Sequence, residues 1–315
     1  MNILKKATVF KCKLPVAAEL SACLSKMAFQ PILETMASSS GFIDTYDQMV
    51  LEVAGGFVVT LRHDEKIMPK SALARIFEER SAAILEETEE ESLTKEQADS
   101  LRETIYGETL KTALIKTTII RGFYYAEDNM FAVETTNKTL ASIFTDRIIR
   151  AVGSVEFVTV HLSDSVGSLT KRLGEYVDGD WDCVPFGFFS MGSYVHLKGS
   201  DDSITVKHDD MACACDALSE AIRAEMKVSK IELHHNLVSF KLDQKFVLSS
   251  ITYEHDVDRE DEDFMTPAEM WVNEAGIRLL QLAAVVRDLL VMFEYKQPEL
   301  LDPAIQEQFS EQGFQ

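Results

Sequence analysis

The stretch Arg121–Thr135 reads RGFYYAEDNMFAVET and decides the fold class that we expect for this chain. Two apolar runs, Arg121–Ala126 and Met130–Thr135, flank the turn-forming tripeptide Glu127-Asp128-Asn129. Apolar runs of strand length on both sides of a short polar turn are typical of a β-hairpin. The sequence therefore predicts two paired antiparallel strands at this point.

A helix and a further strand are expected directly after this hairpin. In Thr139–Val152, TLASIFTDRIIRAV, apolar residues recur at the spacing of one helix face, and Gly153 favours a helix end. A strand is expected next, at Val155–His161. Hairpin, helix and strand in this succession predict a compact α+β unit.

Similar patterns predict the elements that precede the hairpin. Pro69-Lys70-Ser71 resembles a helix start with Ser71 as the capping residue, and Thr94 with Gln97 resembles a capping box. The expected strands are Ala7–Leu14, Met49–Val53 and Gly56–Arg62, and the expected helices are Ala17–Met27, Ala72–Glu87 and one from Lys95 to Tyr106 or Leu114.

The C-terminal half also mixes helices and short strands. Asp209 or Asp210 is expected to cap a helix that runs to about Lys227, and Thr266-Pro267-Ala268-Glu269 combines a capping box with proline at the first helical position. The other expected elements are a helix at Leu169–Tyr176, strands at Phe186–Phe189, Tyr194–Leu197, Ser203–Lys207, Lys230–Leu233, Val238–Leu242 and Phe246–Tyr253, and a terminal helix that reaches Phe293.

Charge is unevenly distributed over the 315 residues, whose formal net charge is −21. Three stretches, Glu78–Glu108, Glu254–Asp263 and Gln297–Gln315, carry −18 of this charge. Elsewhere bases stand without acids, as in Thr109–Ala126, and Arg223–Lys245 holds five bases against three acids. Such segregation permits one cationic surface on an anionic protein, and an evenly mixed solvated surface is the alternative.

Several classes of protein are disfavoured by the sequence. The longest apolar run, Ile277–Phe293, contains charged residues, so we expect a core helix there and not a membrane span. We recognise no signal peptide and expect a cytoplasmic protein. The five cysteines form no CxxC pair, and Cys213 and Cys215 with His208 have poor geometry for zinc, so neither a metal nor a cofactor is expected.

No catalytic motif stands out. The sequence lacks the glycine-rich nucleotide loops and the zinc-protease and serine-hydrolase signatures. The nuclease-like tripeptide (D/E)xK begins at Asp64, Glu225, Asp243 and Glu294, and two of the four hits fall within predicted helix, an unsuitable platform for the metal. We therefore expect no enzyme activity and no catalytic residues. The Phe123-Tyr124-Tyr125 cluster could stack bases, fill a hairpin core or form a protein interface, and adjacent His234 and His235 would face opposite sides of a strand.

A resemblance to a known family runs along most of the chain. In order, the segments KKATVFKCKL, SKMAFQP, DEKIMPKSALARIFEER, DNMFAVETTNKTL, ITVKHDDM and DVDREDEDF resemble the RdgC family of recombination-associated proteins. Each segment is short, but their colinear order over about residues 2–295 is specific.

The resemblance implies a fold and an assembly. The subunit would be α+β, an elongated horseshoe of several small lobes, and two copies would close a ring around duplex DNA. The expected lobes are 1–70 with 119–162, a long helical tip at 71–118 inserted in that lobe, a second lobe at 163–296 and an acidic tail at 297–315.

The resemblance also implies an activity and a site. Family members bind double-stranded DNA with little sequence preference and restrain a RecA-type recombinase by competing for DNA, so a nucleoid location is expected. The DNA-binding residues implied here are Lys207, Arg223, Lys227, Lys230 and Lys198, with Lys111, Lys116 and Arg121 near the contact between subunits. Leu114 and Thr117 stand where family members have phenylalanines.

Two alternatives stay open at this point. The net charge of −21 also fits a protein that binds a protein partner or mimics DNA. The family's exonuclease label implies Mg²⁺-dependent cleavage, although no motif in this chain supports it.

Overall fold

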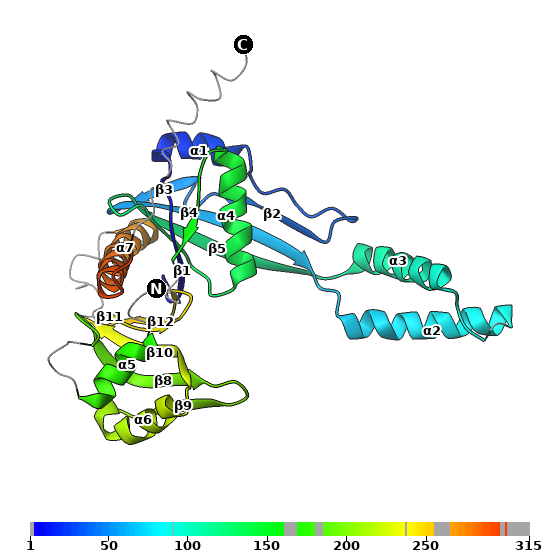
Figure 1. The fold of residues 1–315 in the computed structure, drawn as a ribbon. Helices are drawn as coiled ribbons and strands as arrows, with labels where there is room; N and C mark the ends of the chain where they lie inside the picture. The colour runs from blue at the N-terminus through cyan, green and yellow to red at the C-terminus, as the bar shows by residue number, and fades with distance from the viewer. Residues whose placement is uncertain are drawn as a thin grey trace, which may run out of the picture. The chain divides into compact units, whose positions relative to one another are not determined.

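The computed structural model describes residues 3–89, 91–160, 169–179, 185–236, 238–254, 265–296 and 300 (Figure 1). The chain divides into two compact units. The first comprises Met1–Lys26, Asp44–Thr60 and Ile120–Gln315, and the second comprises Met27–Ile43 and Leu61–Ile119. This division does not test the lobes expected from the sequence, which stay a prediction.

The α+β class is confirmed. In the described part of the chain, seven α-helices accompany one antiparallel sheet with the strand order β2-β4-β5-β6-β1-β12-β11-β10-β8-β9, while β3 pairs with β4 and β7 pairs with β1. The helices are α1 (Ala17–Ser25), α2 (Lys70–Thr88), α3 (Lys95–Thr112), α4 (Lys138–Val152), α5 (Leu169–Asp178), α6 (Cys215–Arg223) and α7 (Pro267–Met292). The strands are β1 (Ala7–Lys11), β2 (Ser38–Ile43), β3 (Val50–Val53), β4 (Gly56–Lys66), β5 (Ile115–Tyr125), β6 (Met130–Val133), β7 (Val158–Thr159), β8 (Ser190–Lys198), β9 (Ser203–Lys207), β10 (Lys227–His235), β11 (Val238–Asp243) and β12 (Val247–Tyr253).

The predicted hairpin forms between β5 and β6 and contributes to the core of the first unit. Phe123 pairs with Ala132, and Tyr124 pairs with Phe131. Phe123, Tyr124 and Tyr125 are all buried, so this cluster is hairpin core and does not stack bases. Asn137 caps α4 through bonds from two backbone amides to its side chain, and Gly153 ends the helix with φ of 89°.

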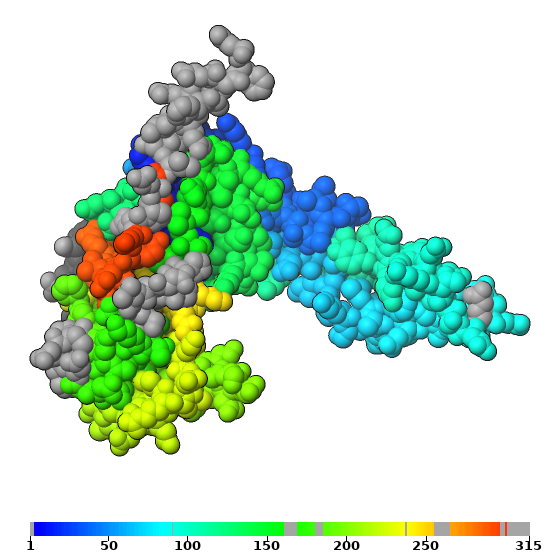
Figure 2. Space-filling view, viewed as in Figure 1, coloured from blue at the N-terminus to red at the C-terminus, as the bar shows by residue number. Residues whose placement is uncertain are grey.

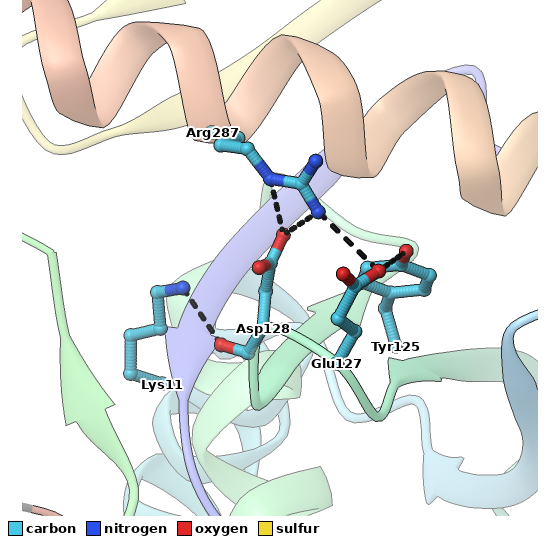
Figure 3. A network of polar contacts seen from close by, with 5 residues as sticks. All are labelled: Lys11, Tyr125, Glu127, Asp128 and Arg287. Carbon is cyan, nitrogen blue, oxygen red and sulfur yellow. Dashed lines mark hydrogen bonds and ion pairs between the residues drawn. The ribbon is translucent and has the colours of Figure 1, made fainter.

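A network of polar contacts joins β1, the β5–β6 turn and α7 (Figure 3). The Lys11 ammonium donates to the carbonyl oxygen of Asp128 at 2.8 Å. Arg287 of α7 donates to the Asp128 carboxylate at 2.9 and 3.1 Å, and Tyr125 bonds Glu127 beside it. Burial lowers the pKa of Lys11 despite the attraction of Asp128, because an ammonium loses its hydration there.

The terminal helix α7 begins as the sequence predicts. Thr266 accepts from the backbone amide of Glu269, whose carboxylate accepts from the Thr266 amide, so the predicted capping box is present with Pro267 at the first turn. Arg278 is buried within α7, donates to Glu274 at 2.6 Å and lies 4.0 Å from the centre of the Tyr253 ring. The helix therefore packs on the sheet through its buried apolar residues and through the cation–π contact of Arg278 with Tyr253 of β12.

The second unit contains the α2–α3 helical hairpin. The predicted capping box of Thr94 and Gln97 begins α3. Lys66 at the end of β4 is buried and donates to the carbonyl oxygens of Leu33 and Glu34. Because its ammonium bonds two backbone carbonyls, Lys66 fixes the loop before β2 to the end of β4.

Several local predictions are wrong. Ser71 caps no helix, because α2 begins at Lys70 after Pro69 and Ser71 lies in its first turn. Phe186–Phe189 is not a strand but a turn, with Gly187 at φ of 57° and the Phe189 amide bonded to the Phe186 carbonyl.

Further errors concern element ends, and within the described residues the strand expected at Val155–His161 is present only as β7. The helix before β10 ends at Arg223, because Glu225 has a φ of 60°, and Lys227 begins the strand β10. Strand β5 begins at Ile115 and not at Arg121, so α3 stops at Thr112. In both places the helix gives way to a strand earlier in the chain than the pattern of polar and apolar residues predicted.

In the described part of the chain, none of the helices combines the length and the hydropathy that crossing a bilayer requires. The terminal helix, α7, is long, but charged residues interrupt its apolar sequence.

Gly122 gives a direct test of the hairpin core. A Cβ at this position would lie 2.3 Å from Phe131 and 2.8 Å from Phe144, whose rings pack against each other. We predict that Gly122→Ala lowers the free energy of unfolding in urea by about 1–3 kcal/mol through overpacking. Gly174→Ala in α5 is the control in the same unit, because its Cβ meets nothing within 4 Å, and it should stabilise by about 0.5–1 kcal/mol. Equal effects of both changes would contradict this packing.

Candidate nucleic-acid interface

Strands β9, β8, β10 and β11 form a sheet region with one covered and one open face. Leu173 of α5 and Leu218 of α6 belong to the same buried core as Val195, Leu197 and Ile231, so the two helices cover one face. Figure 2 shows α5, α6 and these strands as one continuous body in green to yellow. Residues on the opposite face alternate with the buried ones and are polar and at least partly exposed.

Cross-strand register brings five lysines onto this open face. Tyr194 pairs with Lys207, Lys198 with Lys227, and Glu232 with Lys241. Lys230 pairs with both His196 and Asp243. Directly opposite residues of antiparallel strands point to the same side of the sheet, so these side chains share one surface. We call it the lysine face, defined by Lys198, Lys207, Lys227, Lys230 and Lys241.

The ring of Tyr194 lies close to two lysines of the lysine face. The Lys241 ammonium lies 4.1 Å and the Lys207 ammonium 5.9 Å from the centre of the Tyr194 ring. Both distances fall within the range of cation–π attraction. The aromatic ring therefore holds two ammonium groups close together on the sheet surface.

A polar hollow of about 490 Å³ opens beside Tyr194. Its lining combines the two lysines with one glutamate from the sheet and with polar residues that follow β9. The lining residues are Ser193, Tyr194, Lys207, His208, Asp209, Glu232 and Lys241. Such a hollow can accept a phosphate at the ammonium groups, and Glu232 is the carboxylate of the sheet that opposes it.

The predicted DNA-binding residues fall into three groups in the structure. Lys198, Lys207, Lys227 and Lys230 are brought together on the lysine face. Arg223 is exposed at the last residue of α6, outside this face. The assignment of these residues to DNA binding stays a prediction.

The remaining three predicted residues lie at the second unit and its border. Lys111 lies in the last turn of α3 and Lys116 in the first part of β5, both exposed in the second unit. Arg121 belongs to the first unit, donates to Glu134 at 3.4 Å and lies 5.6 Å from the centre of the Trp271 ring. Arg121 thus has intramolecular partners that a phosphate would have to displace.

Two residues of the site were missed by the sequence prediction, Tyr194 and Lys241. The alternation of Tyr194, His196 and Lys198 with buried Val195 and Leu197 was a usable signal for one face. Lys241 had no such signal, because only the register of β8, β10 and β11 places it against Tyr194.

A second pair of lysines lies close together elsewhere in the first unit. The Lys245 side chain, in the turn after β11, lies within hydrogen-bonding reach of Lys138 at the start of α4 and lowers the pKa of Lys138. Two exposed ammonium groups in this arrangement repel each other, and a bound phosphate between them would relieve that repulsion.

The four nuclease-like tripeptides have other contacts in the structure. Asp64 accepts from Arg62 at 2.8 and 2.9 Å, which lowers the pKa of its carboxyl group. Asp243 accepts from the backbone amides of Lys245 and Val247 in a turn. Glu225, predicted to be helical, and Glu294 both lie in turns with positive φ. Within the described residues, no three side chains of His, Cys, Asp or Glu come together as a metal site.

Comparison with known proteins shows which family this chain matches. The family model described as "Putative exonuclease, RdgC" matches residues 3–296.

The chain belongs to the RdgC family. It is 24% identical over 240 residues to the recombination-associated protein RdgC of Cupriavidus necator, covering 75% of this chain and 78% of that protein. The proteins of the same name from Colwellia psychrerythraea and Cupriavidus pinatubonensis are 20% and 23% identical over 293 and 282 residues. These matches cover 90% and 87% of this chain and 93% and 91% of those proteins. The family prediction from the colinear segments is therefore confirmed, and the DVDREDEDF segment among them lies outside the residues that the structure describes.

The lysine face of this RdgC protein should bind polyanions in general. We predict that Lys207→Gln with Lys241→Gln elutes from heparin at lower salt than the unchanged protein, because two of its ammonium groups are lost. The control is Lys26→Gln with Lys296→Gln, which removes the same charge from exposed positions outside this face. Equal elution of the two variants would show that heparin binding does not depend on the lysine face.

Proposed function

We propose that this protein binds double-stranded DNA without sequence preference, as a ring-shaped homodimer that restrains RecA-type recombination by competing for DNA. Membership of the RdgC family and the recombination-associated names of its relatives support the role. The observation that carries the proposal is the convergence of Lys207, Lys230 and Lys241 with Tyr194 on one open sheet face. In a chain of net charge −21, such a cationic face would attract a phosphate backbone.

The dimensions of the lysine face suit a duplex. Lys207, Lys230 and Lys241 lie on β9, β10 and β11, which are separated by three inter-strand steps with β8 between β9 and β10. At about 4.8 Å a step, this spreads the lysines over about 14 Å. The major groove of B-DNA is about 12 Å wide, so the face can reach phosphates on both sides of it.

The chemistry of the lysine face favours phosphates over bases. Its cations are lysines, whose ammonium is a point charge without the planar fork that arginine uses to read guanine. Contacts to phosphates position a protein on DNA but carry no sequence information directly. We therefore expect the lysine face to bind DNA without sequence preference.

The salt dependence of binding tests the site. We predict that changing Lys198, Lys207, Lys230 and Lys241 together to glutamine weakens binding to unrelated duplexes alike. Each lost phosphate contact should flatten the log–log salt slope by about 0.9. Fluorescence anisotropy of a labelled duplex at several salt concentrations measures both quantities.

Two control variants accompany this measurement. Changing Lys26, Lys70, Lys95 and Lys296 to glutamine removes the same charge from exposed positions outside the lysine face and should leave the slope unchanged. Glu232→Gln should strengthen binding, because it removes a carboxylate from the hollow. An unchanged slope in the lysine-face variant would overturn the site, and shortening of the DNA on adding Mg²⁺ would support nuclease activity instead.

Dimer formation has a candidate contact in the segment Thr109–Arg121. Its apolar residues Leu114, Ile115 and Ile119 are 78%, 48% and 47% exposed. Apolar side chains gathered on a surface in this way are typical of protein interfaces. We propose that this segment contacts the second copy, with Lys111 and Lys116 beside the contact.

Sedimentation velocity tests the dimer. We predict that Leu114→Glu with Ile119→Glu shifts the protein to a monomer, because two carboxylates would be buried in the contact. Leu33→Glu, at a residue of the same unit that is 62% exposed, should leave the dimer intact. A stable monomer of the unchanged protein at micromolar concentration would contradict the homodimer.

A further inference from the structure

Helix α2 carries apolar side chains that its own unit buries only in part. None of its residues is fully buried over Lys70–Thr88, although Leu73, Ile76 and Phe77 form part of an apolar face. In the partner helix α3 only Ile105 and Leu110 are buried. The α2–α3 hairpin thus leaves apolar surface uncovered within the second unit.

This uncovered surface is hollowed into a groove of about 490 Å³ between the two helices. Leu73 and Phe77, one turn apart on α2, form one wall, and Ile105 with Tyr106 forms the other. The Arg102 guanidinium lies 4.7 Å from the centre of the Phe77 ring, and Tyr106 remains 43% exposed. We call this hollow the hairpin groove, with Ala74, Glu78 and Glu103 as its other lining residues.

The rim of the hairpin groove is acidic. Glu78 and Glu103 are exposed and make no ion pair with any residue that the structure describes, whereas Arg80 pairs with Glu108 at 2.6 Å. The surrounding segment Glu78–Glu108 holds eleven acids and three bases. An apolar groove with this rim is complementary to a ligand that is apolar on one side and cationic on the other.

We propose that the hairpin groove binds a basic amphipathic helix of a partner protein. An amphipathic helix presents apolar anchors one turn apart, which matches the spacing of Leu73 and Phe77 along the wall. Its lysines and arginines would meet Glu78 and Glu103 at the rim. A second copy of this chain fits less well, because its own hairpin would bring the same excess of acids against this rim.

The variant Ala74→Trp tests the proposal by filling the groove. Ala74 is an exposed lining residue, so tryptophan there would occupy the space without removing a core side chain. Ala83→Trp is the matched control, because Ala83 is exposed on the same helix about two and a half turns further along and faces the opposite side. Glu78→Lys with Glu103→Lys reverses the charge of the rim without any bulky addition.

The probe is a fluorescein-labelled peptide of about 18 residues, five helical turns, with leucines on one face and lysines on the other. A scrambled peptide of the same composition has the same charge but no apolar face. We expect the amphipathic peptide to bind the full chain, measured by fluorescence anisotropy. Ala74→Trp and the rim variant should each weaken binding about tenfold or more, while Ala83→Trp should not.

Three results would overturn the proposal. The scrambled peptide could bind equally well, which would reduce the effect to charge attraction. Both the Ala74→Trp and the rim variant could retain full affinity. Ala74→Trp alone could convert a dimer to a monomer in sedimentation velocity, which would make the groove a contact between copies. Duplex binding of the same variants separates this proposal from the DNA-binding one, because the lysine face lies outside the groove and should bind as before.

Discussion

The structure depends on the pairing of the short strand β1. One edge of β1 pairs with β6, and the other pairs with β12 and β7. Strand β1 thereby joins the β5–β6 hairpin to the strands β8–β12 in a single hydrogen-bonded sheet. Its side chains are largely buried, and Lys11 at its end bonds the turn that Arg287 of α7 also holds. The region that carries the lysine face is positioned by this ladder.

Segregation of charge would allow this anionic protein to bind an anionic polymer. Most of the net charge of −21 lies in three stretches, none of which contributes to the lysine face. The acid-rich stretch Glu78–Glu108 lies mainly in α2 and α3, where part of it surrounds the hairpin groove. In our account, one chain thus presents a cationic sheet face to phosphates and an acidic helical hairpin to a basic helix.

Local sequence signals predicted most of the helices and strands. The contacts that they did not predict depend on the register between strands that are distant in sequence. The capping boxes at Thr94 and Thr266 and the β5–β6 hairpin were predictable because each is encoded within a few residues. Lys227 was placed in a helix because only the backbone conformation of Glu225 ends that helix early. Tyr194 and Lys241 meet only through the pairing of β8, β10 and β11, which no local pattern specifies.

Equilibrium binding of the unchanged protein to duplex DNA tests the proposed function most simply. Two labelled duplexes of about 40 base pairs and unrelated sequence would be titrated between about 50 and 200 mM salt. We predict equal affinities for the two sequences and a linear fall of log affinity with log salt, as counterion release requires. Absence of binding at the lowest salt would contradict this prediction and would favour an acidic protein that binds partners or mimics DNA.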